Sequence, residues 1–305
     1  MPIATGPLVA GIDFSPESRR ALDAAAALAR AWRCPLHLVA AVEPLLAEAA
    51  RLRHQLPAFM DQVEKDLREF AAPVATPADS VSFEAAAGEP APVLLAAAAR
   101  VQARLIVVGT RGRGRAARLM LGSTTLRLLR AADRPILVTD LDDRGAAADA
   151  AMAAGVTHLV CGVDFSDGSL AAVEVAGRWA TTLGATITLV HALPRAGVPV
   201  GWDALAAEVE ADRLRQATTR LADVARKMKL QATVRAGVGS PAHVLAEESG
   251  SDLHAIVVVG LRGSSHHRPG STALSVLATT RVPVLAVPES RTRSTSLPTT
   301  TAGAA

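Results

Sequence analysis

The chain repeats itself, and this repeat constrains the fold more than any other feature of the sequence. VAGIDFSPES at 9–18 returns as VCGVDFSDGS at 160–169, and IVVGTRG at 106–112 returns as VVVGLRG at 257–263. Both matches have an offset of 151 residues. A chain of 305 residues has room for two ordinary domains, each with its own core. We therefore predict two domains of one fold.

Within each repeat, short aliphatic runs alternate with helical patterns, which is typical of a parallel sheet with crossover helices. The prediction is an α/β fold of two tandem doubly wound domains, with helices on both faces of each sheet. In the first domain we expect strands at 8–12, 36–42, 81–85, 105–108 and 135–139. We expect helices at 18–32, 90–101 and 124–131, and a helical stretch at 45–72 that is interrupted or kinked at Pro57.

A long glycine-rich connection follows the fourth predicted strand. Gly109 and Gly112 allow close backbone approach, and Gly122, Ser123 and Thr124 open the next helical pattern. A plain connection needs about 2–6 residues, and about a dozen intervene here, which favours a functional loop. Free amides at the start of a helix bind anions. We therefore predict an anion site, with a purely structural turn as the alternative.

The spacing Gly109-x2-Gly112-x9-Gly122-Ser123 after a buried strand resembles the universal stress protein family, in its nucleotide-binding branch. The resemblance implies a five-stranded parallel sheet of strand order 3-2-1-4-5 in each domain. It also implies ATP as the ligand, accompanied by Mg²⁺ where hydrolysis occurs, with the loop around the phosphates and ribose.

Two further residues of the first domain match the family's site. Asp13 matches the aspartate that contacts the adenosine part, and Ala41 matches an adenine-contacting valine. Asp13 or Ser15 could instead cap the following helix, and Ala41 could simply pack in its strand. The predicted nucleotide-binding residues are Asp13, Ala41, Gly109, Gly112, Gly122, Ser123 and Thr124.

The second domain carries the same pattern in altered form. Six residues separate Gly263 from Gly270, where the first domain has nine between Gly112 and Gly122. We expect this second site to be weaker, altered or empty. Its residues are Asp164, Ala192, Gly260, Gly263, Gly270 and Ser271.

Three functions remain open at this point. The first is a nucleotide-binding sensor or regulator of the stress response. The second is a scaffold that binds no nucleotide and self-associates through an edge strand, the fifth by resemblance. The third is an adenine-nucleotide-dependent enzyme. No Walker loop, HExxH or GxSxG motif is present, so no catalytic residue and no metal ligand is predicted, and any ATP hydrolysis should be slow.

Composition indicates which classes of partner to expect and where the domains begin and end. A net charge of +3 and 3% aromatic residues do not indicate nucleic-acid binding. Without an 18-residue apolar segment no membrane partner is expected, and two isolated cysteines fit a reducing cytoplasm. We expect a first domain at 1–141, a linker at 142–157, a second domain at 158–289 and a disordered tail at 290–305.

Overall fold

The computed structural model describes residues 6–74, 80–110, 121–139, 155–195, 203–250, 252, 254–261 and 271–289. The expected tail, and the expected linker up to residue 154, lie outside these residues. The elements of the first domain are β1 (Leu8–Ile12), α1 (Pro16–Trp32), β2 (Leu36–Val42), α2 (Pro44–Leu52), α3 (Leu56–Ala71), β3 (Val81–Ala87), α4 (Pro90–Arg100), β4 (Leu105–Gly109), α5 (Ser123–Ala131) and β5 (Ile136–Thr139).

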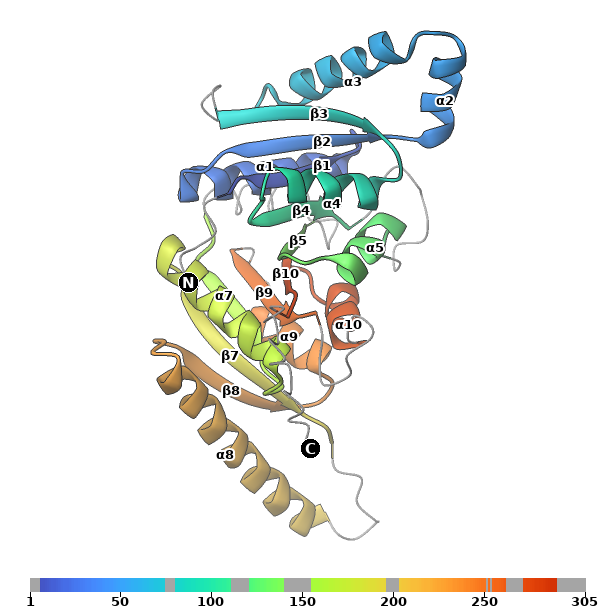
Figure 1. Cartoon of the computed structure of the whole chain (residues 1–305). Coiled ribbons are helices and arrows are strands. Elements are labelled where there is room, and N and C mark those ends of the chain that lie inside the picture. The colour runs from blue at the N-terminus through green and yellow to red at the C-terminus, as the bar shows by residue number, and fades with distance from the viewer. Residues whose placement is uncertain are drawn as a thin grey trace, which may run out of the picture.

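The second domain repeats this order of elements (Figure 1). Its elements are β6 (His158–Gly162), α7 (Asp167–Leu183), β7 (Thr186–Leu193), α8 (Asp203–Lys227), β8 (Thr233–Val238), α9 (Pro241–Ser249), β9 (Ala255–Gly260), α10 (Ser271–Thr279) and β10 (Val284–Val287). The long α8 occupies the place that α2 and α3 share in the first domain.

All these strands form one ten-stranded sheet, of order β3-β2-β1-β4-β5-β10-β9-β6-β7-β8. Each half has the predicted order 3-2-1-4-5, with parallel pairing throughout. The two halves meet where β5 and β10 pair antiparallel, with Leu137 opposite Leu285. The two fifth strands are therefore partners within one chain, and β3 and β8 are the outermost strands of the sheet.

Helices cover both faces of the sheet, and a separate core lies under each layer. One core contains Leu22 of α1, Leu67 of α3, Val173 of α7 and Leu221 of α8. The other contains residues of α4, α5, α9 and α10, among them Leu94, Leu128, Leu245 and Val276. Alternate residues of each strand point to opposite faces, which is why the buried strands are almost continuously aliphatic. Both domains thus share a three-layer architecture (Figure 1).

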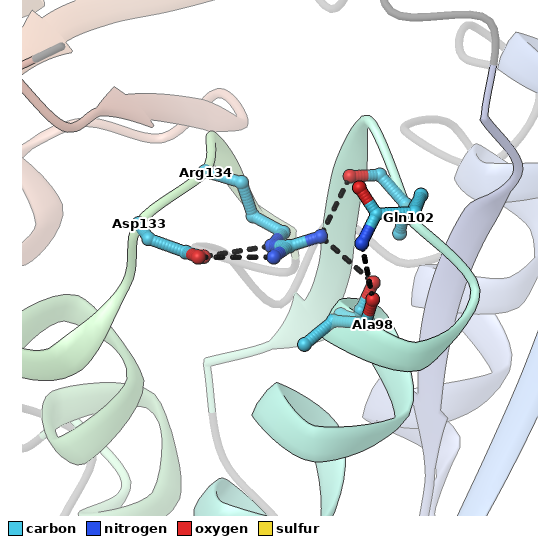
Figure 2. A network of polar contacts seen from close by, with 6 residues as sticks. Ala98, Gln102, Asp133 and Arg134 are labelled. Carbon is cyan, nitrogen blue, oxygen red and sulfur yellow. Dashed lines mark hydrogen bonds and ion pairs between the residues drawn. The ribbon is translucent and has the colours of Figure 1, made fainter. Parts of the chain in front are cut away.

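Local chemistry explains where several helices begin and end. The predicted interruption near Pro57 is confirmed: α2 ends at Leu52 and α3 begins at Leu56, with Pro57 in its first turn, where no amide is needed. At the other end of a helix, Arg134 donates to the carbonyls of Ala98 and Ala103 at 2.7 and 2.9 Å (Figure 2). The Ala98 carbonyl also accepts from the amide of Ala103 at 2.8 Å, so this guanidinium joins the last turn of α4 to the segment that follows it.

Candidate functional site

The turn between β1 and α1 is held by a serine and an aspartate. Ser15 is the N-cap of α1, and its hydroxyl accepts from the amide of Ser18 at 3.1 Å. Asp13 Oδ1 in turn accepts from the amide and the hydroxyl of Ser15, at 3.1 and 2.5 Å. Between them Phe14 has φ of 63°, which is unusual for an aromatic residue. Of the two capping candidates, Ser15 caps the helix and Asp13 fixes the turn.

The second domain builds the same turn residue for residue. Asp164 Oδ1 accepts from the amide and hydroxyl of Ser166, at 3.0 and 2.5 Å, and Phe165 has φ of 64°. Burial acts to raise the pKa of Asp164. The hydrogen bonds from Ser166 and Ser169 outweigh that effect, so that the pKa lies below its ordinary value. Both turns therefore hold a carboxylate at the carboxyl end of a central strand.

In the first domain, the two ends of the glycine-rich loop are hydrogen-bonded to each other near the Asp13 turn. The amide of Gly122 donates to the carbonyl of Thr110 at 2.8 Å, and the amide of Thr110 donates to Thr139 at 3.0 Å. The hydroxyl of Thr125 donates to the carbonyl of Gly109 at 3.0 Å. Residues 111–120, with Gly112 among them, lie outside the described residues. The loop thus leaves and re-enters the fold at one point, at the carboxyl edge of the sheet.

Packing accounts for one glycine at the end of each fourth strand. A Cβ on Gly109 would lie 3.1 Å from both the Cβ and the carbonyl oxygen of Glu17, in the first turn of α1. A Cβ on Gly260 would lie 2.7 Å from the carbonyl oxygen of Gly168, in the first turn of α7. A Cβ would therefore collide with backbone at Gly260 and would be tightly packed at Gly109, where α1 would have to shift slightly. Packing thus favours glycine at both positions with or without a ligand.

The first turn of α5 supplies the donors expected of an anion site. Gly122 is the N-cap, and the first helical bond runs from the amide of Leu126 to Gly122. The amides of Ser123, Thr124 and Thr125 come before that bond, in the turn whose N–H groups have no acceptor within the helix. Ser123 is exposed and Thr124 is partly exposed. This turn can donate several hydrogen bonds to a phosphate, and the helix dipole favours a negative charge there.

The strand alanines that match the family's adenine contact lie at the same sheet edge. Ala41 is partly exposed near the end of β2, opposite Ala86 of β3. In the second domain, Ala192 lines a cleft of about 510 Å³ together with Pro194, Arg195, Gly239, Ser240 and Pro241. The first domain has Glu43 and Glu89 at the positions of Pro194 and Ser240. The rim of this cleft thus lacks the two acidic side chains that the first domain has at the corresponding positions.

Other predicted residues lie apart or outside the described residues. Gly263 and Gly270 are outside them, and Ser271 is the first residue of α10. His191 and Ser169, two further residues of types that could act in catalysis, make hydrogen bonds to backbone: His191 Nδ1 lies 2.6 Å from the carbonyl oxygen of Val163, and the Ser169 hydroxyl donates to the carbonyl of Ser166. No cluster of three metal-binding side chains occurs in the described part of the chain.

Sequence reasoning missed the threonines that close the loop. Thr110, Thr125 and Thr139 are all buried, and they make their hydrogen bonds to backbone groups of neighbouring elements. For Thr110 and Thr139, a threonine at the end of an aliphatic run was the available signal, whereas Thr125 lies within α5 and gave none. Only the fold shows which carbonyl each threonine reaches.

A search of the described helices for a membrane span finds none with the length and apolar character that crossing a bilayer needs.

Comparison with known proteins identifies this architecture. The model of the universal stress protein family matches residues 5–140 and again 155–288. The fold is similar to that of a universal stress protein from Archaeoglobus fulgidus, with a TM-score of 0.66, 16% identity, and coverage of 93% of this chain and 99% of that one.

Two structures from Pseudomonas aeruginosa are also similar. A protein of unknown function from strain PAO1 has a TM-score of 0.62 and 21% identity, and each chain is covered to 94%. A universal stress protein from strain UCBPP-PA14 has a TM-score of 0.59 at the same identity and coverage. No curated protein matches the chain. With two family matches that together span most of its length and a sheet of the expected order in each half, the chain belongs to the universal stress protein family.

Proposed function

We propose that the first domain binds ATP and that the protein acts as a cytoplasmic sensor or regulator of the stress response. The observation that carries this proposal is the closure of the glycine-rich loop by the Thr110–Gly122 hydrogen bond, directly before the first turn of α5. The phosphates would contact the amides of that turn and the hydroxyls of Ser123 and Thr124. The adenosine part would lie against Asp13 and Ala41, at the ends of β1 and β2.

The residues present fit a nucleotide better than a metal held by protein alone. The first turn of α5 offers backbone donors to an anion, while Asp13 is a carboxylate already oriented by Ser15. Mg²⁺ takes oxygen ligands and keeps several waters, so it would arrive with the phosphates rather than bind a protein cage. Among the described residues proposed for the nucleotide site none is assigned as a general base, and we propose that hydrolysis is at most slow.

The second domain is proposed as a separate, weaker site. Its aspartate turn and its cleft at Ala192 support binding of a base, and the three residues missing from its loop disfavour a triphosphate. Gly260, Gly263, Gly270 and Ser271 remain its proposed phosphate-side residues. ATP bound at both sites would give two nucleotides per chain, and ATP at the first alone would give one.

Isothermal titration of the whole chain with ATP and Mg²⁺ tests the proposal. Asp13→Ala and Gly122→Val should each weaken binding about tenfold or more, since a lost hydrogen bond to a charged group is worth about 1.5–3 kcal/mol. Gly122 has φ of −60°, so the backbone accepts a side chain there. The matched change Asp164→Ala should leave the tight site intact. Absence of ATP binding, or full affinity in both first-domain variants, would contradict the proposal.

Self-association through edge strands is a further proposal. Because β5 and β10 pair with each other, an intermolecular contact of this kind would use β3 or β8. Sedimentation of the wild type and of a variant with Ala85→Pro in β3 would test it. A dimer that persists unchanged in this variant and in the matched Ala236→Pro variant of β8 would place the contact elsewhere.

A further inference from the structure

A serine, a histidine and a glutamate on β2 and β3, the last two strands at one edge of the sheet, form a continuous chain of contacts. His37 of β2 has Nδ1 at 2.8 Å from the hydroxyl of Ser82 and Nε2 at 2.8 Å from Glu84 Oε2, both on β3. A carboxylate only accepts hydrogen bonds, so Nε2 carries the ring proton. In the neutral ring the lone pair of Nδ1 is therefore directed at the hydroxyl of Ser82.

The surroundings leave the serine accessible and hold the histidine in place. His37 is 5% exposed, whereas Ser82 is exposed. Val81 and Phe83 pack into the core that contains Leu67 of α3, so Ser82 and Glu84 point to the opposite face of β3. Arg100, at the end of α4, pairs with Glu84 and fixes the carboxylate. The hydroxyl thus faces outward while its base and the orienting acid are fixed behind it.

The second domain shows that the fold does not need this chain of contacts. In its register Thr188 of β7 lies opposite Thr233 of β8, as His37 lies opposite Ser82. Arg235 takes the place of Glu84 at the internal offset of 151 residues. The repeat therefore keeps the strand pairing and a hydroxyl at Thr233, but it has neither the base nor the acid. A network needed for sheet stability would be expected in both copies.

We propose that Ser82, His37 and Glu84 form a second functional site, a nucleophile with its base that transfers acyl groups from activated esters. The Ser82 oxygen attacks the ester carbonyl while its proton passes to His37 Nδ1, and Glu84 stabilises the resulting imidazolium through Nε2. The alcohol leaves with the proton from Nδ1, and Ser82 holds the acyl group until water, activated by the same nitrogen, releases it as the acid. Here Nδ1 faces the serine and Nε2 the carboxylate, whereas in the Ser-His-Asp triad Nε2 faces the serine and Nδ1 the carboxylate.

The outer edge of β3 supplies the remaining requirement, donors for the developing oxyanion. Among the described strands β3 pairs with β2 alone, so the amides on its outer side have no partner strand there. In this proposal these amides would be the donors for a carbonyl bound at Ser82. His37 and Ser82 lie in the amino-terminal halves of β2 and β3 and Glu84 lies at the middle of β3, whereas the proposed nucleotide site is at the carboxyl ends of β1, β2 and β4 and the start of α5, so we expect activity without ATP.

The test is labelling of the whole protein with an alkyl fluorophosphonate, followed by mass spectrometry of the peptides. Attack by Ser82 on phosphorus expels fluoride and leaves a stable adduct on that residue. We expect one adduct, on Ser82, that heat-denatured protein does not form. His37→Gln should slow labelling by about a hundredfold, within the range known for general base catalysis.

Matched variants distinguish this site from chance reactivity. Ser82→Ala should remove the adduct, and Thr233→Ser, which places a serine on the equivalent strand without a histidine beside it, should add none. Glu84→Gln keeps the shape of the side chain and should also slow labelling, which covers the case that His37→Gln fails to fold. Labelling equal in native and denatured protein, or unchanged in Glu84→Gln, would overturn the proposal, as would an adduct on the introduced serine.

Discussion

At the scale of single residues, the two aspartate turns show how a charge is made useful by local hydrogen bonds. Asp13 and Asp164 each accept from a serine two positions later, and that serine caps the following helix. The carboxylate is thereby fixed before any ligand arrives. A fixed carboxylate loses less conformational freedom on binding than a free one.

The lowered pKa of Asp164 makes stability depend on pH in one direction. The folded state favours the charged carboxylate, so its contribution is present above the ordinary value of 3.8 and is lost as pH falls through the lower folded pKa. Asp164→Asn keeps an acceptor but no charge. We expect its free energy of unfolding in urea to be lower than that of the wild type at pH 7, with the difference shrinking below pH 3.8. A difference in unfolding free energy that does not shrink at low pH would contradict this assignment.

The glycines at the ends of β4 and β9 give a second prediction. Gly109→Ala should destabilise the protein by about 1–3 kcal/mol, as overpacking does. Gly260→Ala should cost more, because its Cβ would lie 2.7 Å from a backbone oxygen against 3.1 Å at Gly109. Urea unfolding without nucleotide measures both. Two neutral substitutions would mean that the glycines serve the ligand alone.

At the scale of elements, most helices and strands of the first domain were predicted from the sequence, and their predicted ends differ from the observed ends by a few residues. The strand at 36–42 and the interruption before α3 agree with the structure because aliphatic runs and prolines act locally. β3 continues to Ala87, beyond the predicted end at residue 85, because pairing with β2 extends through Val42. The Thr110–Gly122 bond joins residues on either side of the loop, and local patterns carry no information on such contacts.

Arg134 provides a test of how one side chain ends an element. It is 14% exposed and donates to the carbonyls of Ala98 in α4 and Ala103 after it, while also pairing with Asp133 (Figure 2). Arg134→Ala should lower the free energy of unfolding by about 2 kcal/mol, since buried carbonyls lose a charged donor. Arg68→Ala breaks an exposed pair with Glu64 and should cost about 0.5 kcal/mol or less. Equal costs in thermal unfolding would contradict this view of the cap.

At the scale of the whole molecule, the two domains share one sheet and one pair of tryptophans. β5 and β10 pair antiparallel, and Trp32 of α1 meets Trp179 of α7 edge to face, with ring centroids 4.6 Å apart. The sequence showed the duplication but not this junction. Each fifth strand is equally aliphatic whether its partner lies in the same chain or in another, so composition does not distinguish the two.

The tryptophan pair should carry stability from one domain to the other. Trp179 is 8% exposed, and Trp179→Ala should cost about 3–5 kcal/mol while also loosening the end of α1. The amides of Arg33 and Cys34, bonded to Arg30 and Ala29, would then exchange faster with deuterium. Leu221→Ala opens a cavity within the second domain, away from α1, and should leave these two amides protected. Equal acceleration of exchange at these two amides in both variants would contradict this prediction. The loss of stability would then pass between the domains through the β5–β10 ladder and not through the tryptophan pair.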